Sequence, residues 1–501
     1  MLDTSYIIPT VISVLTNPFA ITMIFVGTFM GLTFGALPGL TATLGVTLLI
    51  PITYGLESYV AIGMLIGVYV GAMAGGAVAS IMLNIPGTPS NIVTCFDGYP
   101  MCQQGLGAQA MGWAAVASTF GSLFSWFVLV SVSTVIAAVA TSFSSPEYAA
   151  LALLGLSIVG SIASGDPVKG LSMAAFGVFL SLIGMDRIYG VFRFTFGSFN
   201  LMAGVALMPV LLGVYSIPQM LQICNESSTV TQVNIKLKNF LPSPIKLWRA
   251  KVPLLISSTI GTLIGIVPAV GATIACFLSY DQCKRVSKSP ETFGKGNYEG
   301  VIASEATNSA SVGGALVPLL TLGIPGDSVT AIMLGGLMIH GVQPGPRLFG
   351  EQPDFVIGIF TCMLIATIMM LLIQLVGIQF FVKALSLPNS YLVAGLIVIA
   401  TIGAFSINRN FFDVGIMLVL GSLAYFLVKA KYPIPPLVLG LVLGELLESE
   451  TRTALRMHSN DWMIFFKRPV PCVLIIISVL IFVCTLYKPA IDKFIKKVTR
   501  K

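Results

Sequence analysis

Residues 303–328 read ASEATNSASVGGALVPLLTLGIPGDS and combine polar side chains with an apolar run. Six polar residues fall within eight positions: Ser304, Glu305, Thr307, Asn308, Ser309 and Ser311. An apolar run long enough to enter a membrane follows them and breaks at Ile324-Pro325-Gly326-Asp327. Polar groups at membrane depth are costly unless they face a site. This stretch therefore predicts a binding site inside a membrane.

The composition of the whole chain indicates a membrane protein. Of 501 residues, 56% are hydrophobic and 9% are charged, and the mean hydropathy is +0.93, whereas soluble globular chains carry about 25% charged residues. Apolar runs of about 20 residues, the length that spans a hydrocarbon core, recur along the chain. We predict an all-α polytopic membrane protein with about 12 transmembrane helices, no enzyme domain and no nucleic-acid partner.

The formal charge of +7 bears first on topology, because Lys and Arg are retained on the cytoplasmic side of a membrane. Basic residues after Tyr487 outnumber the single acid Asp492, so we predict a cytoplasmic C-terminus. The N-terminus lacks the pattern of a cleaved signal peptide, which indicates a first membrane segment. The scattered cysteines form no CxxC pair, and the two histidines are too far apart to suggest a zinc cage.

The two halves of the chain share a pattern of small residues and breaks. Gly31, Gly35, Pro38, Ala42 and Thr43 match Gly261, Gly265, Pro268, Ala272 and Thr273 at a constant offset of 230. Gly75-Gly76-Ala77 matches Gly313-Gly314-Ala315 at an offset of 238, and Ile85-Pro86-Gly87 matches Ile324-Pro325-Gly326 at 239. The shared order predicts two homologous halves, residues 1–224 and 252–501, joined by a cytoplasmic linker at 225–251.

Paired breaks in corresponding positions of two halves indicate the binding site of a secondary transporter. A helix that begins just after Pro-Gly presents free N–H groups and the positive end of its dipole, which suits a carboxylate. Carbonyl groups released where the preceding helix stops suit Na⁺, together with Ser, Thr and Asn oxygens. We predict inverted repeats with re-entrant hairpins or broken helices, whose breaks at Pro38, Pro86, Pro268 and Pro325 meet near the midplane.

The segment 252–280 lies between two hydrophilic gaps with basic residues. If both gaps are cytoplasmic, this segment enters and leaves the membrane on one side. At about 1.5 Å per residue, the arms Pro253–Val267 and Ala269–Tyr280 reach about 22 and 18 Å, too short to span. A re-entrant hairpin with its tip at residues 268–271 fits these charges. A single Pro-kinked, tilted helix is the alternative.

Several signals also have structural interpretations. The glycine spacing before Gly75 favours close helix packing. Glu305 and Asp327 are either site residues or helix caps at the membrane surface. Three basic residues are expected to snorkel to an interface: Lys169, Arg187 and Arg193. The charged cluster from Glu445 to Asp461 is expected to form a solvated loop.

Three motifs together resemble the large membrane subunit of the tripartite tricarboxylate transporter family over nearly the full length. They are Gly35-Ala-Leu-Pro-Gly-Leu40 with Thr41 and Thr43, Asn84-Ile-Pro-Gly-Thr-Pro-Ser90, and Glu305-Ala-Thr-Asn308 followed by Gly313-Gly314-Ala315 and Pro318-Leu-Leu-Thr-Leu-Gly-Ile-Pro-Gly326. The resemblance implies a multi-pass importer of small, citrate-like carboxylates in a bacterial inner membrane, coupled to Na⁺ or H⁺. It also implies a small four-helix membrane subunit and a periplasmic solute-binding protein, and an elevator movement would suit the architecture by analogy.

The candidate site follows from the breaks and their polar neighbours. The candidate substrate-binding residues are Pro38, Gly39, Thr41, Thr43, Pro86, Gly87, Thr88, Ser90, Asn91, Thr273, Asn308, Ser309, Gly326 and Ser328. The coupling-ion candidates are Glu305, Asn308, Ser311 and Asp327, with Glu305 as the proton carrier if H⁺ drives uptake. No cofactor is expected beyond the coupling ion. The alternatives are a channel, which needs a ring of charges or carbonyls around a pore, and an intramembrane protease, which needs paired Asp or Ser with His.

Overall fold

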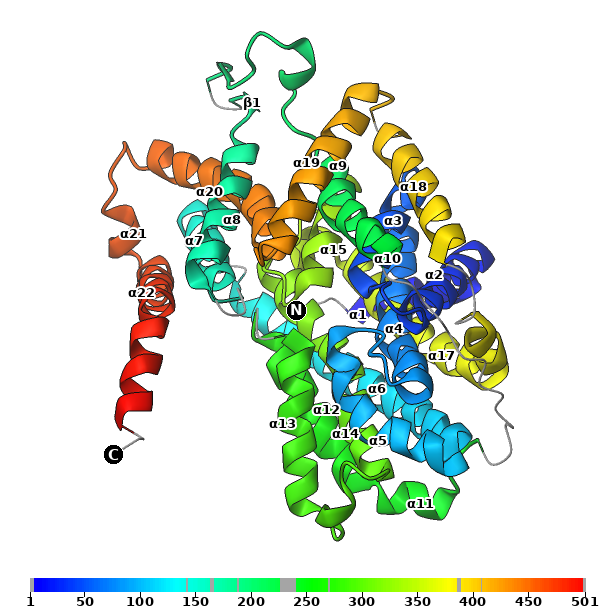
Figure 1. Ribbon diagram of the computed structural model, residues 1–501. Helices are drawn as coiled ribbons and strands as arrows, with labels where there is room; N and C mark the ends of the chain where they lie inside the picture. Colours follow the sequence, from blue (N-terminus) through cyan, green and yellow to red (C-terminus); the bar gives the residue numbers. More distant parts are fainter. Residues whose placement is uncertain are drawn as a thin grey trace. The chain divides into compact units, whose positions relative to one another are not determined.

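The computed structural model describes residues 4–140, 143–162, 166–186, 189–225, 240–268, 271–384, 389–406 and 408–498 (Figure 1). The chain divides into two compact units, Met1–Thr141 with Tyr215–Arg409 (unit 1) and Ser142–Val214 with Asn410–Lys501 (unit 2). Each unit contains segments from both halves of the predicted repeat. The half boundaries at 224 and 252 stay a prediction, and most of the predicted linker, residues 226–239, lies outside the described residues.

Unit 1 is built from helices. They are α1 (Thr4–Thr16), α2 (Pro18–Ala36), α3 (Ala42–Thr53), α4 (Ser58–Leu83), η1 (Pro89–Asn91), α5 (Ile92–Met101), the π-helical η2 (Cys102–Leu106), α6 (Gly107–Ala140), α10 (Ile217–Asn225), α11 (Pro244–Arg249), α12 (Lys251–Ile266), α13 (Gly271–Val286), η5 (Pro290–Thr292), α14 (Tyr298–Leu322), α15 (Ser328–Ile339), α16 (Leu348–Glu351), α17 (Pro353–Ala384) and α18 (Asn389–Ser406).

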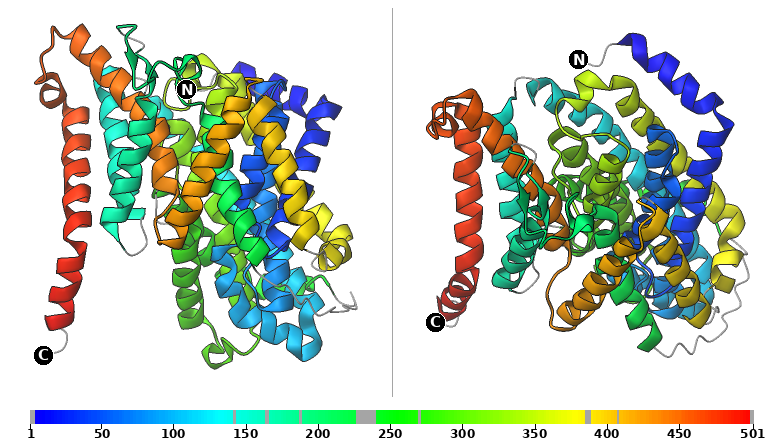
Figure 2. Two further views of the ribbon diagram at one scale, coloured as in Figure 1. Left: turned by 45° about the horizontal axis from the view of Figure 1, so that its top comes forward. Right: turned by 90° about the horizontal axis from the view of Figure 1, so that it is seen from above.

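Unit 2 adds a second helical group and a short hairpin. Its elements are α7 (Ser145–Ile162), α8 (Pro167–Ser181), β1 (Gly184–Met185), β2 (Phe192–Arg193), η3 (Phe199–Leu201), α9 (Leu207–Leu211), α19 (Phe411–Lys429), α20 (Pro435–Met457), α21 (Ile464–Lys467) and α22 (Pro469–Val498). The π-helical η4 (Leu212–Ser216) crosses the sequence boundary between the units. Strands β1 and β2 pair antiparallel, and α22, red in Figure 2, packs beside α7.

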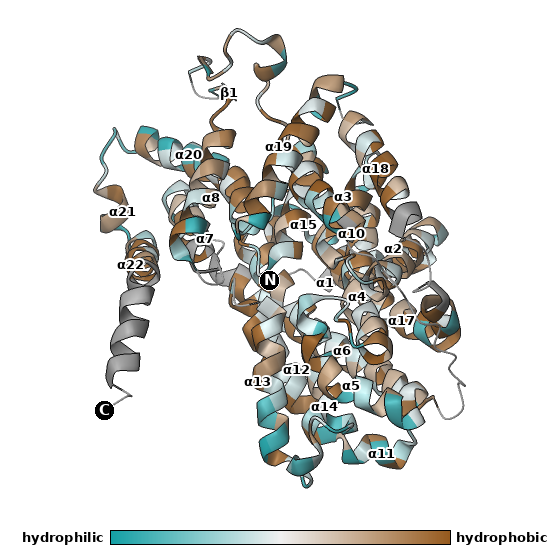
Figure 3. Cartoon of the chain, viewed as in Figure 1, coloured by the Kyte–Doolittle hydropathy of each residue, from teal (hydrophilic) through white to brown (hydrophobic). Residues whose placement is uncertain are grey.

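Six of the described helical segments are long and apolar enough to cross a membrane. They are Pro18–Ala36, Ser58–Leu83, Pro89–Ile136, Leu207–Cys224, Pro353–Val382 and Phe411–Lys429. Shorter apolar helices lie between them, and Figure 3 shows mostly apolar helices with hydrophilic residues gathered at the C-terminal end of α13. The chain is an all-α, multi-pass membrane protein, and the number of 12 spans stays a prediction.

Glycines allow the helices at the centre of unit 1 to pack with their backbones in contact. A Cβ added at Gly27, Gly31 or Gly35 of α2 would lie 2.1–2.2 Å from a carbonyl oxygen of α4. In the second half, a Cβ at Gly261 or Gly265 of α12 would lie 2.4 or 2.7 Å from a carbonyl oxygen of α14. Small residues permit such close approach of helices in lipid. A Cβ at Gly67, Gly71 or Gly75 of α4 would lie 2.4–2.8 Å from a carbonyl oxygen of α2. The packing interpretation of the glycine spacing before Gly75 is therefore confirmed.

The segment after residue 250 forms two separate helical arms. α12 and α13 pack against each other, and the Cys283 thiol, near the end of α13, contacts the Pro253 carbonyl oxygen at 3.9 Å and the Ser257 hydroxyl at 3.4 Å. Contacts between the first turns of one arm and the last turns of the other define an antiparallel hairpin. The alternative of one kinked helix is therefore wrong, although residues 269–270 at the tip lie outside the described residues.

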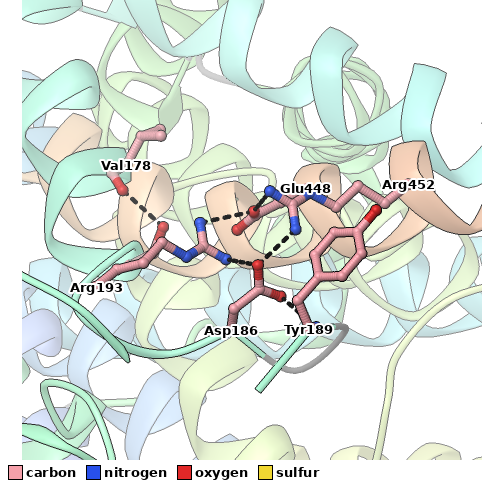
Figure 4. A network of polar contacts seen from close by, with 7 residues as sticks. Val178, Asp186, Tyr189, Arg193, Glu448 and Arg452 are labelled. Carbon is pink, nitrogen blue, oxygen red and sulfur yellow. Dashed lines mark hydrogen bonds and ion pairs between the residues drawn. The ribbon is translucent and has the colours of Figure 1, made fainter. Parts of the chain in front are cut away.

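One expectation about charged residues in unit 2 is wrong. The cluster from Glu445 to Asp461 is not simply a loop, because α20 continues to Met457. The Arg193 guanidinium pairs with Asp186 at 2.8 Å and Glu448 at 2.9 Å, and its snorkelling to an interface stays a prediction. Arg452 pairs with the same two carboxylates at 2.7 and 2.9 Å (Figure 4).

The other two basic residues have separate outcomes. The Lys169 ammonium donates to the Ala430 carbonyl oxygen at 2.7 Å and lies over the Tyr432 ring. These contacts anchor the side chain at the end of α19. Arg187 lies outside the described residues.

Candidate functional site

At the first-half break, after α4, the chain makes a tight turn. α4 ends at Asn84 in the left-handed conformation, with φ 58°, and Pro86 removes a backbone donor just beyond it. A Cβ at Gly87 would lie 2.3 Å from the Gly35 carbonyl oxygen and 2.6 Å from the Gly76 Cα. Only glycine fits here, because the break packs directly against the backbones of α2 and α4.

The second-half break after α14 repeats this arrangement. α14 ends at Gly323 with φ 69°. A Cβ at Gly326 would lie 2.6 Å from the Ala315 Cα and 2.9 Å from the Gly265 carbonyl oxygen. Gly326 thus contacts Gly265 as Gly87 contacts Gly35, and these are matched pairs in the sequence repeat. The equivalent contacts support the repeat, which stays a prediction.

Glu305 lies at the middle of the site. It is fully buried within α14. Its Oε1 atom accepts hydrogen bonds from Asn91 Nδ2 at 2.8 Å and Thr94 Oγ1 at 2.5 Å, and Ser118 Oγ donates to its Oε2 at 3.4 Å. The cap interpretation of Glu305 is wrong, because a side chain in the middle of a 25-residue helix caps neither end.

Asn308 lies one turn further along α14 and bonds both to the first-half break and to α4. Its side-chain oxygen accepts from Ser90 Oγ at 2.7 Å, and its Nδ2 donates to the Met73 carbonyl oxygen at 2.9 Å. Thr88 in turn contacts Ser90 at 2.9 Å and also bonds to the Asn91 side chain. The polar residues after Pro86 in the first half therefore meet the polar residues of α14 in the second.

Asp327 begins α15 and serves as its N-cap. Its Oδ1 accepts from the Thr330 backbone N–H at 2.8 Å, and the Asp327 N–H donates to Thr330 Oγ1 at 2.8 Å, forming a capping box. The Tyr69 hydroxyl of α4 donates to Oδ2. Asp327 therefore caps α15, and its carboxylate also links α15 to the first half. Its position relative to the membrane surface and its role as a site residue stay predictions.

The polar groups at the Pro38 break have a different partner. Thr41 caps α3, contacts the Thr43 hydroxyl at 2.6 Å and donates to Gln219 Oε1 at 3.2 Å. Gln219 also donates to the Gly39 carbonyl oxygen. These residues form their own cluster with α10, although the glycine contact above brings the end of α2 against Gly87.

Four other predicted residues have less definite surroundings. Thr273 and Ser328 lie half-buried in the first turns of α13 and α15. The Ser311 hydroxyl donates to the Asn308 backbone carbonyl at 2.7 Å. The Ser309 hydroxyl is buried, and within the described part of the chain it has no hydrogen-bond partner.

Four residues without a predicted role bond to the predicted ones: Tyr69, Thr94, Ser118 and Gln219. Each is a polar side chain in an apolar helix, which is the only signal that marked them. Nothing in their spacing identified their partners.

The site contains carboxylates but no buried basic side chain among the described residues. None of the buried polar or charged side chains in the described residues is Lys, Arg or His. No cluster of three His, Cys, Asp or Glu side chains occurs in the described ranges either. The side chains that line the site therefore carry hydroxyl groups, amide groups and two carboxylates.

These features define a multi-pass α-helical membrane protein whose broken helices enclose a polar site. The chain belongs to the tripartite tricarboxylate transporter TctA family, whose sequence model matches residues 21–439. The resemblance in the motifs is therefore confirmed, and the family is one of transporters.

Two relatives from Agrobacterium vitis are similar to this chain. The "52.8 kDa protein in TAR-I ttuC' 3'region" is 35% identical over 463 residues, covering 92% of each chain. The "protein in TAR-II ttuC' 3'region" is 38% identical over 210 residues, covering 42% of this chain and 87% of the relative. No solved structure matches.

Proposed function

We propose that the chain is the membrane subunit of an ion-coupled importer of small di- or tricarboxylates. The observation that carries this function is the bonding of Asn91 and Ser90, after the first-half break, to Glu305 and Asn308 of the second half. Paired breaks that converge on buried polar groups are typical of secondary transporters. The family membership supplies the substrate class.

The chemistry of the site supports coupling to a cation. A carboxylate such as Glu305 is costly to bury unless it is neutralised. A carboxylate substrate would add further negative charge, and the described residues of the site supply no basic side chain to balance it. Each Na⁺ or H⁺ that enters with the substrate would offset one unit of this negative charge.

The substrate carboxylates are proposed to contact the helix N-termini after the breaks. Hydroxyl groups at Thr41, Thr43, Thr88 and Ser90 would add hydrogen bonds, with Thr273 and Ser328 at the starts of α13 and α15. Backbone N–H groups at helix N-termini favour anions without adding a formal charge.

The family also implies partners: a small four-helix membrane subunit and a periplasmic solute-binding protein that delivers substrate, in a bacterial inner membrane with the C-terminus in the cytoplasm. All of the candidate site residues belong to unit 1 and none to unit 2. This division supports an elevator movement, in which a site-bearing part moves against a scaffold.

The test is uptake of radiolabelled citrate and shorter carboxylates into vesicles that contain the chain, its small subunit and its binding protein. Na⁺ and pH gradients are imposed separately. Uptake that one gradient drives and that needs the binding protein is expected. A flux that needs neither gradient nor binding protein would instead establish a channel.

A further inference from the structure

Helices α6 and α14 pack side by side near Glu305 and run in the same direction. Three contacts between them fix their register. Ser118 bonds to Glu305, Gly121 lies against the Ala306 carbonyl oxygen, and Ser125 lies against Gly313. The residue numbers rise together along both helices at these three contacts. Residues 118–125 of α6 therefore face residues 305–313 of α14.

This register places Ser122 and Ser309 at the same level and at the centre of the interface. Ser122 lies one turn beyond Ser118 and one turn before Ser125, and Ser309 lies one turn beyond Glu305 and one before Gly313. Both side chains are at most 1% exposed. The register therefore puts both hydroxyl groups on the surfaces along which α6 and α14 pack.

Neither hydroxyl has a hydrogen-bond partner among the described residues. Buried serines in helices commonly bond to a carbonyl one turn earlier. Ser125 and Ser311, close by on the same two helices, do so, at 3.1 and 2.7 Å. The oxygen atoms of Ser122 and Ser309 are therefore free to bind something else.

The Glu305 carboxylate is satisfied on one side only. Oε1 receives two hydrogen bonds of 2.8 Å or less, from Asn91 and Thr94, whereas Oε2 receives a single long bond of 3.4 Å from Ser118 on α6. Oε2 is thus the atom on the side of the two serines. Residues four apart on a helix have Cβ atoms about 5–6 Å apart, a gap that one small ion bridges.

We infer that Ser122 Oγ, Ser309 Oγ and Glu305 Oε2 bind Na⁺ between α6 and α14. Hard cations take several oxygen ligands, and a carboxylate among them balances the charge. A proton on Oε2 would need only one acceptor, such as Ser118, and would leave both serine hydroxyls without a partner. One Na⁺ accounts for all three oxygen atoms. Its role in transport rests on the proposed function, whereas its binding does not.

The test is Na⁺ binding to the purified full-length chain in detergent, without substrate or partners. The melting temperature is measured as NaCl replaces choline chloride at constant ionic strength, with KCl as a second series. The melting temperature of the wild type should rise with Na⁺ and not with K⁺. Ser122→Ala and Ser309→Ala should each raise the Na⁺ concentration at half effect about tenfold or more, as loss of a metal-site contact does.

Ser125→Ala is the matched control, because its hydroxyl bonds to its own helix in the same interface. It should leave the Na⁺ response unchanged. The inference is overturned if wild type melts identically in NaCl and choline chloride, or if Ser122→Ala and Ser309→Ala respond as Ser125→Ala does. A stabilisation by low pH without a Na⁺ effect would assign Glu305 to a proton and also overturn it.

The uptake assay separates this outcome from the function. Carboxylate uptake driven by a pH gradient, with no Na⁺ response, would remove the Na⁺ site and leave the importer. Na⁺ binding at these serines in a chain that transports no carboxylate would leave the site and remove the importer.

Discussion

Two carboxylate clusters in this chain differ in how their charge is balanced. In unit 2, Asp186 and Glu448 share the guanidinium groups of Arg193 and Arg452, with four ion-pair contacts of 2.7–2.9 Å (Figure 4). In unit 1, Glu305 accepts hydrogen bonds from an amide and two hydroxyl groups, and no described basic side chain pairs with it.

Under the proposed function, the unit 2 cluster is structural and the Glu305 cluster takes part in transport. Two arginines neutralise the two carboxylates of unit 2 permanently, so that cluster is complete without a ligand. Glu305 is fully buried, and no basic side chain among the described residues pairs with it. Burying such a charge is favourable only when something neutralises it. A carboxylate whose counter-ion comes and goes is what ion coupling requires.

The largest effect is expected for Glu305→Gln, which keeps the side-chain size and removes the charge. Substrate uptake should fall about 100-fold, the upper range for loss of a contact that tunes an ion site. The measurement is carboxylate uptake under a Na⁺ gradient and under a pH gradient. The melting temperature of the variant tests whether it folds. The same substitution in the paired cluster, Glu448→Gln, should leave the ion dependence of uptake intact. Equal uptake by Glu305→Gln and wild type would remove the distinction between the clusters.

The next effect is expected for Asn308→Ala, which removes the two hydrogen bonds that join α14 to Ser90 Oγ and to the Met73 carbonyl. Each such hydrogen bond contributes about 0.5–1.5 kcal/mol, so uptake should fall about tenfold. Initial uptake rates at equal expression measure this. Thr321→Ala, also on α14, is the control, because its hydroxyl bonds only to its own helix. Unchanged uptake and ion dependence in Asn308→Ala would contradict the central site.

A smaller effect, on stability, is expected for Gly87→Ala. The new Cβ would lie 2.3 Å from the Gly35 carbonyl oxygen, and overpacking of this kind costs about 1–3 kcal/mol. Gly326→Ala, its match in the second half, should act similarly. Thermal unfolding in detergent measures both. Gly350→Ala, with no atom near its added Cβ, is the control, and a difference in sign between Gly87→Ala and Gly326→Ala would count against the repeat.

Arg452→Gln removes one of the two cations of the unit 2 cluster. Arg193 still faces both carboxylates, and Arg452 is about a third exposed, so the loss should be about 0.5–1 kcal/mol. The melting temperature should fall slightly, while the Na⁺ or pH dependence of uptake stays as in wild type. A change in the coupling ion on this substitution would show that the paired cluster is not merely structural.

The smallest effect is expected at the exposed pair of Asp461 and Lys467, which lie 2.6 Å apart. The hydrogen bond from Lys467, and then that from the Met463 N–H, lower the pKa of Asp461. A lowered folded-state pKa stabilises the fold above the ordinary aspartate pKa, about 3.9, and this is lost as the pH falls below it. Asp461→Asn should therefore change the melting temperature less than Arg452→Gln does at pH 7. At a pH below the folded-state pKa of Asp461, where the carboxyl group is protonated, it should not change the melting temperature. A larger change at low pH than at neutral pH would contradict this.

Much of the architecture was predictable because its signals are local. Pro86 and Pro325 end helices, as Pro and Gly do in any chain, and the glycines before Gly75 allow backbone contact. Glu305 and Asn308 stood out because polar groups in an apolar run need a reason to be there. Charge on both sides of the segment 252–280 favoured the hairpin over the kinked helix.

Other features were not predictable because they depend on partners distant in sequence. The continuation of α20 past Glu445 is stabilised where Glu448 and Arg452 pair with Asp186 and Arg193, which lie more than 250 residues earlier in the chain. The local charge pattern alone therefore predicts a loop. Ser118 and Ser122 carried no signal beyond a hydroxyl in an apolar helix.

The sequence by itself determined the membrane class, the positions of the breaks and the helix that carries the polar residues, because hydropathy and backbone preferences act over a few neighbouring residues. Only the tertiary structure decided which polar groups meet: Asn91 with Glu305, Ser90 with Asn308, Tyr69 with Asp327. The register between packed helices sets those contacts, and it follows from the fit of whole helix surfaces. The charge balance of each cluster depends on those contacts.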